Sequence, residues 1–175
     1  METMEETEAA EVRESGFKKI IYTSQERTEL LEETPWSKTF GARQIETLAD
    51  YMRAYKAKKG CVIFQEDDAE SFMCMIIRGS VDIISSTGGS SRVVVNLQRG
   101  QSLGEMSLVD GRPRSASAVA TTDSLLLVLS RDHFEHLIDE HAGLGVRFLL
   151  RLSRLISERL RRTNTLLEES IARSS

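Results

Sequence analysis

The residues best suited to chemistry stand together in the segment 100–120, GQSLGEMSLVDGRPRSASAVA. Its first half, from Gly104 and Glu105 onward, can form a single helical turn after a tight bend. The first backbone N–H groups of such a turn have no intrahelical acceptor, and with the local dipole they attract an anion. Arg114 and Ser115 follow just before a strand-like run. Because an arginine fork matches phosphate oxygens, the segment predicts a phosphate-binding site.

The carboxylate of Glu105 needs its own explanation, because it repels a phosphate group. A sugar hydroxyl that donates a hydrogen bond to Glu105 supplies one, since a carboxylate only accepts hydrogen bonds. A phosphate site beside a hydroxyl site favours a nucleotide ligand. The structural alternative is an ion pair between Glu105 and Arg114 at the rim of a barrel. Arg112, in the turn after Asp110 and Gly111, is expected to be a solvated turn residue.

The segment closely resembles the phosphate-binding cassette of the cyclic nucleotide-binding domain family. That family includes the catabolite activator protein, the regulatory subunits of cyclic AMP-dependent protein kinase and cyclic nucleotide-gated channels. Its approximate pattern is G-E, two or three small or apolar residues, L-x-x-G-x-P-R-(S/A/T)-A-(S/T)-(V/A), and every position has a match within residues 104–118. The resemblance covers roughly residues 26–165. One departure is Asp67, where the family usually has glycine; Asp tolerates positive φ better than most residues.

The resemblance implies a set of ligand-binding residues. Within the cassette, Glu105 matches the acceptor for the ribose 2′-hydroxyl, Arg114 matches the arginine that binds the cyclic phosphate, and Ser115 matches a donor to a phosphate oxygen. The whole set that we expect from the resemblance is Gly104, Glu105, Met106, Ser107, Arg114, Ser115, Ala116, Arg159, Thr163 and Asn164.

The last three of these residues belong to a stretch that resembles the helix closing over the base in the catabolite activator protein. Arg159 falls where an arginine supports the ribose-binding glutamate. Thr163 and Asn164 fall where side chains meet the adenine edge, from the same chain or from a partner subunit. Alternatively, this polar break in an apolar stripe only sets the register of a helical dimer.

The elements that position these residues can be read from the spacing of apolar residues, which changes from helical to strand-like along the chain. Helices are expected from Ser24 to before Thr34–Pro35 and over residues 41–54, where apolar residues recur at helical spacing. Short runs rich in Val and Ile follow, separated by Gly and Asp, and indicate an antiparallel sandwich or barrel with a hairpin turn at Gly88–Gly89. We expect strands at 61–64, 72–77, 81–85, 92–97, 116–120 and 124–129.

Helix returns from Arg131 to the end of the chain. Gly143 and Gly145 mark an expected bend, and residues 146–172 form an apolar stripe on a helix of ~40 Å. A barrel of this size cannot cover such a helix, so its far end is expected to pair with a second copy as a homodimer. Its arginines, mixed with glutamates, are expected to form a solvated flank rather than a nucleic-acid site.

Length and charge bound the domain organisation. The chain has 175 residues and a net charge of −4, but residues 1–14 hold six Glu and one Arg, so the rest is nearly neutral. We expect an acidic disordered tail over 1–24, a cyclic nucleotide-binding domain over 25–141 and a long helix over 142–175 that acts as hinge, lid and dimer contact. With the resemblance, the fold class is mainly β with flanking helices: a double-stranded β-helix, or jelly-roll barrel, with N-terminal helices and a long C-terminal helix.

The expected function is regulatory. The resemblance implies that the chain binds a cyclic nucleotide, cyclic AMP in the first place with cyclic GMP as the alternative, and relays occupancy through its C-terminal helix to an effector protein. No cofactor, metal site, catalytic residue, DNA-binding domain or membrane span is expected, and Cys61 and Cys74 read as buried residues of a cytoplasmic protein. If complete, the chain is a stand-alone module. The alternative is a ligand-free dimeric scaffold that keeps the fold.

Overall fold

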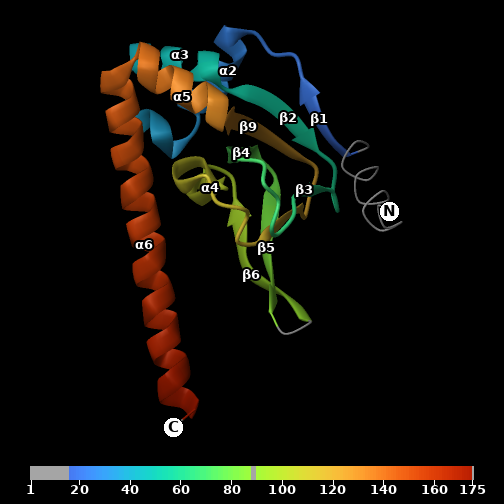
Figure 1. Ribbon diagram of the computed structural model, residues 1–175. Coiled ribbons are helices and arrows are strands. Elements are labelled where there is room, and N and C mark those ends of the chain that lie inside the picture. The colour runs from blue at the N-terminus through green and yellow to red at the C-terminus, as the bar shows by residue number, and fades with distance from the viewer. Residues whose placement is uncertain (1–15, 88–89, 175) are drawn as a thin grey trace. The chain divides into compact units, whose positions relative to one another are not determined.

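The computed structural model describes residues 16–87 and 90–174 (Figure 1). The chain divides into two compact units, Met1–His136 and Leu137–Ser175. The strands are β1 (Phe17–Ile20), β2 (Arg53–Ala57), β3 (Val62–Phe64), β4 (Phe72–Arg78), β5 (Ser80–Thr87), β6 (Ser90–Gln98), β7 (Ser102–Leu103), β8 (Ser117–Ala120) and β9 (Ser124–Ser130). The helices are α2 (Ser24–Glu32), the 3₁₀ helix η1 (Pro35–Lys38), α3 (Ala42–Tyr51), α4 (Glu105–Asp110), α5 (Arg131–Glu140) and α6 (Ala142–Ser174).

The strands of the first unit form two antiparallel sheets, in the orders β1-β2-β9-β4-β7 and β3-β8-β5-β6. Apolar side chains from both sheets, among them Phe64, Phe72 and Leu126, share one buried cluster. This arrangement confirms the expected mainly β fold with flanking helices, which is of the jelly-roll type. The predicted turn at Gly88–Gly89 lies outside the described residues, although the flanking strands pair from Thr87 opposite Ser90.

Three strands were not expected from the sequence. The tail prediction is wrong for residues 17–20, which form β1 and pair with β2. The helix predicted over 41–54 ends at Tyr51, and β2 begins at Arg53. β1 stays in place because the Phe17 ring stacks on the Tyr55 ring, with centroids 4.7 Å apart. β7 has only two residues, too few to give a periodic signal.

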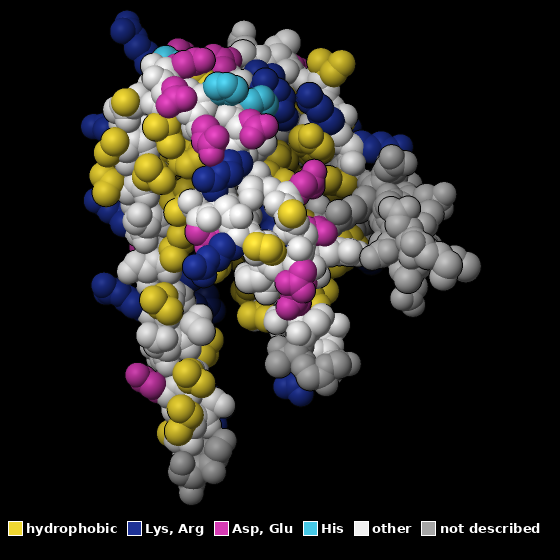
Figure 2. All heavy atoms as spheres, in the orientation of Figure 1, with side chains coloured by type: hydrophobic (Ala, Val, Ile, Leu, Met, Phe, Trp, Pro, Cys, Tyr) yellow, Lys and Arg dark blue, Asp and Glu magenta, His cyan; other side chains and the backbone are white. Residues whose placement is uncertain are grey.

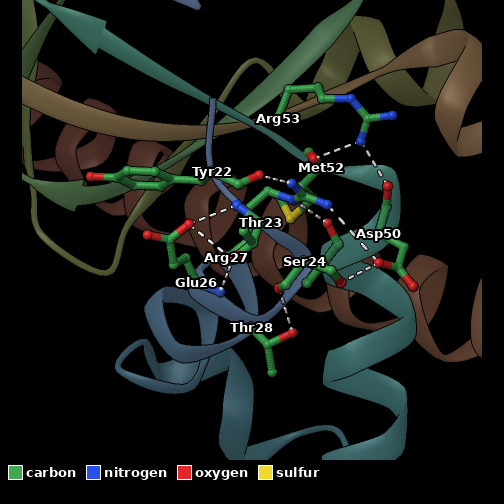
Figure 3. Close-up of polar contacts among 10 residues, drawn as sticks. Tyr22, Thr23, Ser24, Glu26, Arg27, Thr28, Asp50, Met52 and Arg53 are labelled. Carbon is green, nitrogen blue, oxygen red and sulfur yellow. Dashed lines mark hydrogen bonds and ion pairs between the residues drawn. The ribbon is translucent and has the colours of Figure 1, made fainter. Parts of the chain in front are cut away.

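The predicted helix at Ser24 is confirmed as α2, and polar contacts fasten its start to the end of α3 (Figure 3). Thr23 caps the helix: its hydroxyl accepts from the Glu26 N–H at 3.2 Å, and its own N–H donates to the Glu26 carboxylate at 2.7 Å. Arg27 Nε donates to the Ala49 carbonyl oxygen at 2.9 Å. Burial lowers the pKa of this guanidinium. These contacts therefore hold α2 and α3 together as a pair.

The second unit consists of the last residues of α5 and the 33-residue helix α6. The expected bend at Gly143 and Gly145 is wrong, because both residues lie inside α6. The chain instead leaves helical geometry at His141, whose carbonyl oxygen accepts from the N–H groups of Leu144 and Gly145 at 2.9 Å each. In the part of the chain that the structure describes, no helix is both long and apolar enough to cross a bilayer.

Alanine substitutions at Gly143 and Gly145 are expected to have opposite effects on stability. A Cβ at Gly143 meets nothing within 4 Å, whereas one at Gly145 would lie 2.9 Å from Ile138 Cγ1 and 3.1 Å from Ile138 Cα. Gly143→Ala should stabilise the protein by about 0.5–1 kcal/mol, because alanine loses less backbone entropy in a helix. Gly145→Ala should destabilise it by about 1–3 kcal/mol through overpacking. Thermal unfolding of both variants checks this; a bend at these glycines would make both substitutions unfavourable.

Candidate functional site

The first part of the predicted cassette folds as expected, as one short helix after a tight bend. Gly104 precedes α4 with φ +79°, and Gly111 ends it with φ +67°. The Ser107 hydroxyl donates to the Gly104 carbonyl oxygen at 3.2 Å, and the Gly111 N–H donates to the Ser107 carbonyl oxygen at 2.9 Å. Glu105 and Ser107 are buried, whereas Met106 is exposed. The first turn of α4 thus directs Glu105 and Ser107 inward.

Arg114 is the most enclosed cation of the cassette, with 3% of its surface exposed. Its Nη1 atom donates to the Ser107 hydroxyl at 2.5 Å and to the Phe72 carbonyl oxygen at 2.8 Å. It also lies 3.3 Å from the Gly104 carbonyl oxygen. The guanidinium carbon lies 4.0 Å from the centre of the Phe64 ring and 4.3 Å from that of Phe72. Aromatic faces attract a cation, so two rings and three oxygen atoms hold the orientation of the guanidinium.

The main chain of Arg114 is fixed by the turn before β4. Its N–H donates to the Asp68 carbonyl oxygen at 2.9 Å, and its carbonyl oxygen accepts from the Asp67 N–H at 2.9 Å. Asp67 has φ +68°, so the expectation that aspartate sustains this turn is confirmed. The turn consequently sets the position at which the Arg114 side chain leaves the backbone.

The charges of Glu105 and Arg114 act on the same part of the core. Burial raises the pKa of the Cys74 thiol to about 12; Arg114 opposes this shift and Glu105 adds to it. Cys61 and Cys74 are both buried, as predicted; Cys74 lies in β4, whereas Cys61 directly precedes β3 rather than lying in the strand. A carboxylate and a guanidinium enclosed near one another at the cassette can serve two ends of one polar ligand.

The structure brings the cassette residues together in the first unit. Gly104, Ser107 and Arg114 are joined by the hydrogen bonds above, and Glu105 and Met106 lie on the same helix. Ser115, exposed, and Ala116, half-buried, follow Arg114 directly.

The other three predicted residues, Arg159, Thr163 and Asn164, lie on α6 in the second unit. There the Thr163 hydroxyl donates to the Arg159 carbonyl oxygen at 3.0 Å, a contact within the helix. Their contact with a base stays a prediction.

Phe64, Phe72 and Asp68 also shape the site, and sequence reasoning missed all three. They lie about 40–50 positions before Arg114 and read as ordinary strand and turn residues. Only the pairing of the strands could have placed their rings and carbonyl oxygens beside the cassette.

The histidines near α5 offer no comparable centre. His133 is half-buried, and burial together with the charge of Arg53 lowers the pKa of its imidazole. Within residues 16–87 and 90–174, no three His, Cys, Asp or Glu side chains gather so that they could hold a metal ion. The cassette is therefore the site with the clearest binding chemistry.

Comparison with known proteins gives the class of this site. Residues 55–141 match the family model of the cyclic nucleotide-binding domain, and this part of the chain belongs to that family. The cAMP-dependent protein kinase regulatory subunit of Aspergillus niger is 32% identical over 108 residues, 62% of this chain and 26% of that protein. The cyclic AMP receptor protein of Thermus thermophilus is 33% identical over 96 residues, 54% of this chain and 44% of that protein.

One solved structure is similar to this chain over most of its length. The cyclic nucleotide-binding domain from Methylobacillus flagellatus shares 28% identity, with a TM-score of 0.75 and coverage of 85% of each chain. The chain spans about a quarter of the Aspergillus relative and less than half of the Thermus relative. The family resemblance drawn from residues 104–118 is thus confirmed.

Proposed function

We propose that this chain binds a cyclic nucleotide, with cyclic AMP as its preferred ligand, and acts as a regulatory rather than a catalytic module. The observation that carries the proposal is the enclosed pair of Glu105 and Arg114 at the cassette, 3% exposed each. Arg114 supplies donors for the cyclic phosphate, and the first N–H groups of α4 add to them. Glu105 accepts from the ribose 2′-hydroxyl. Two relatives named for cyclic AMP support this nucleotide over cyclic GMP.

The orientation of Arg114 supports a preorganised site. Ser107, Gly104 and Phe72 hold the guanidinium through Nη1, and the rings of Phe64 and Phe72 flank it. A side chain that is already ordered loses little entropy when it binds. Arg114 is therefore expected to bind the cyclic phosphate without first reordering its side chain.

The same proposal gives α6 the role of relay. Ligand binding favours one arrangement of the helix, as in any population shift, and the break at His141 is where the helix can change direction. Arg159, Thr163 and Asn164 serve as the lid over ribose and base. Exposed Leu160, Leu167 and Ile171 supply a dimer contact, and an effector protein reads the outcome. We place this module in the cytoplasm, where free thiols persist.

Calorimetry of the full chain with cyclic AMP and cyclic GMP tests the proposal. We expect saturable binding of cyclic AMP, with weaker binding of cyclic GMP. Absence of heat with either nucleotide at millimolar concentration would contradict it. If the chain were then dimeric and showed no nucleotide-induced thermal shift, the ligand-free scaffold would be the better description.

Glu105→Gln provides a sharper test, because it replaces the carboxylate with a near-isosteric amide. A hydrogen bond to a charged group contributes about 1.5–3 kcal/mol, so affinity for cyclic AMP should fall roughly 10- to 100-fold. The 2′-deoxy analogue of cyclic AMP lacks the hydroxyl, so its affinity should change much less. Titration of both ligands into both proteins measures the difference.

The exposed Glu46 on α3 offers the matched control, because Glu46→Gln makes the same chemical change outside the cassette. That variant should bind both ligands as the wild type does. An equal loss of both ligands in Glu105→Gln would remove the 2′-hydroxyl from the role proposed for Glu105.

A further inference from the structure

A row of cations crosses one face of the five-stranded sheet in the first unit. Lys56 in β2 lies opposite Lys18 in β1 on one side and opposite Leu125 in β9 on the other. Leu125 in turn lies opposite Arg78 in β4. Residues opposite one another on neighbouring strands project from the same face of a sheet, so these side chains form one line across four strands. We call Lys18, Lys56 and Arg78 the cation row.

The cation row is exposed and has no carboxylate partner among the residues that the structure describes. All three cations are exposed, and none of the ion pairs in that part of the chain includes one of them. Asp123, two residues before Leu125, instead accepts from Lys58 Nζ at 2.7 Å and from the Lys59 N–H at 2.9 Å. Figure 2 shows basic and acidic side chains interspersed on the face of the molecule that it draws. A row of cations without a carboxylate therefore departs from the general pattern of the surface.

The stability of the sheet does not explain the row. Like charges directly opposite one another on antiparallel strands are destabilising, and Lys18 and Lys56 are such a pair. A lysine on an edge strand can prevent unwanted strand pairing, but this explains Lys18 alone, because β2 and β4 are inner strands. An unfavourable arrangement without a structural benefit indicates a functional surface, here one for an anionic partner.

The row is also separate from the nucleotide site. Arg78 ends β4, whereas Phe72, whose carbonyl oxygen accepts from Arg114, begins it. Six steps of about 3.3 Å place the two ends of this strand about 20 Å apart. A partner at the row therefore does not occupy the cassette, and its binding goes beyond the function proposed above.

The length of the row indicates what kind of anion fits it. Neighbouring strands lie about 4.8 Å apart, so the row from Lys18 to Arg78 extends about 14 Å over three intervals. An extended polypeptide rises about 3.4 Å per residue and directs alternate side chains to one side, so three acidic side chains on alternate residues extend over the same length. The flexible stems of the lysines take up the remaining differences in spacing. The three carboxylates of such a segment can therefore meet all three cations at once.

Two other anionic partners fit the row less well. A membrane surface binds more strongly where apolar side chains enter it, but Leu125, the apolar member of the line, is only 6% exposed. A long nucleic acid extends beyond the row and meets the rest of a chain whose net charge is −4. A short acidic segment avoids most of this repulsion, because exposed charges more than about 8 Å away are largely screened at physiological salt.

We infer that the cation row binds an extended acidic segment of a partner protein, with carboxylates on alternate residues. The contact is electrostatic, so it weakens with salt, and it needs no nucleotide. A bound carboxylate also offsets the repulsion between Lys18 and Lys56, so the partner removes the unfavourable term that the free sheet carries.

Fluorescence anisotropy of the full chain without nucleotide tests this inference. The probe is a fluorescein-labelled twelve-residue peptide of alternating Ser and Glu. We expect saturable binding at 50 mM NaCl and an affinity at least about ten-fold lower at 500 mM. The row variant, Lys18→Gln with Lys56→Gln and Arg78→Gln, should lose this binding. Its Tm should rise slightly, because the substitutions remove the like-charge repulsion.

The charge-matched control replaces three exposed cations outside the row by Gln, namely Lys38, Arg43 and Arg92. This variant should bind the peptide as the wild type does. Equal binding by the wild type and the row variant, or an equal loss in the control variant, would overturn the inference. Loss of binding together with a lower Tm in the row variant would assign the row to folding and would overturn it as well.

Two further probes separate the kinds of partner. A peptide of the same length that repeats Glu-Glu-Ser-Ser has the same charge, but its carboxylates on each side are four residues apart, so only two of them fall within the row at once. This peptide should bind more weakly, and equal affinity would contradict the match to alternate carboxylates. Vesicles of phosphatidylcholine and phosphatidylserine at 7:3 should not sediment the protein. Sedimentation that the row variant abolishes would make an anionic membrane the partner and overturn the inference.

Discussion

Replacing Arg114 with alanine is expected to lower the affinity for cyclic AMP by about a hundred-fold or more. Each charge-assisted hydrogen bond to a phosphate oxygen contributes about 1.5–3 kcal/mol, and an arginine fork makes two. The loss is expected to be this large because Arg114 is enclosed, so water cannot take its place at low energetic cost. Calorimetry with cyclic AMP measures the effect directly.

Two comparisons make this result specific. Arg112→Ala removes the same side chain from an exposed position two residues earlier and should leave the affinity unchanged. Arg114→Lys keeps the charge but loses the planar fork, so it should fall between the wild type and Arg114→Ala. Because Arg114 Nη1 also donates to Phe72 and Ser107, thermal unfolding must first show that each variant is folded at the titration temperature. Unchanged affinity in folded Arg114→Ala would remove this residue from the site.

The cassette could be predicted from the sequence because its information is local. The left-handed conformations at Gly104 and Gly111, the short helix between them and the position of Arg114 all follow within eleven residues. Turn glycines and a helix start are features of near neighbours along the chain, which is where sequence patterns are most informative.

The surroundings of Arg114 could not be predicted, because they depend on strands that are distant in sequence. Phe64 belongs to one sheet and Phe72 to the other, and both rings reach the guanidinium. Each reads in the sequence as an ordinary core residue. Their second role depends on strand register, and a shift of one residue would turn each ring away from Arg114.

Near the start of α6, glycine residues led to a wrong prediction of a bend. Two glycines at positions 143 and 145 favoured a bend, yet they lie inside α6. Gly145 is explained by the approach of Ile138, which leaves no room for a Cβ. A glycine can thus mark close packing as readily as a change of direction, and the sequence alone does not separate the two.

Gly104→Ala is expected to impair both stability and nucleotide binding, because two separate effects meet at this position. The backbone has φ +79°, which costs a residue with a Cβ about 1–2 kcal/mol. A Cβ there would also lie 2.6 Å from the Phe72 carbonyl oxygen and 2.7 Å from Arg114 Nη1. Neither atom can move without disturbing β4 or the guanidinium, so we expect a total loss of about 3 kcal/mol or more. Affinity for cyclic AMP should fall at least about ten-fold.

Gly60→Ala separates the two effects, because Gly60 has φ +82° but a Cβ at this position would meet nothing within 4 Å. This variant should lose only about 1–2 kcal/mol of unfolding free energy and keep the wild-type affinity for cyclic AMP. Denaturant unfolding and calorimetry on both variants therefore measure the cost of crowding Arg114 as a difference between two equally strained glycines. Equal losses of stability, with affinity retained in both, would mean that the close approach of Gly104 to Arg114 has no part in binding.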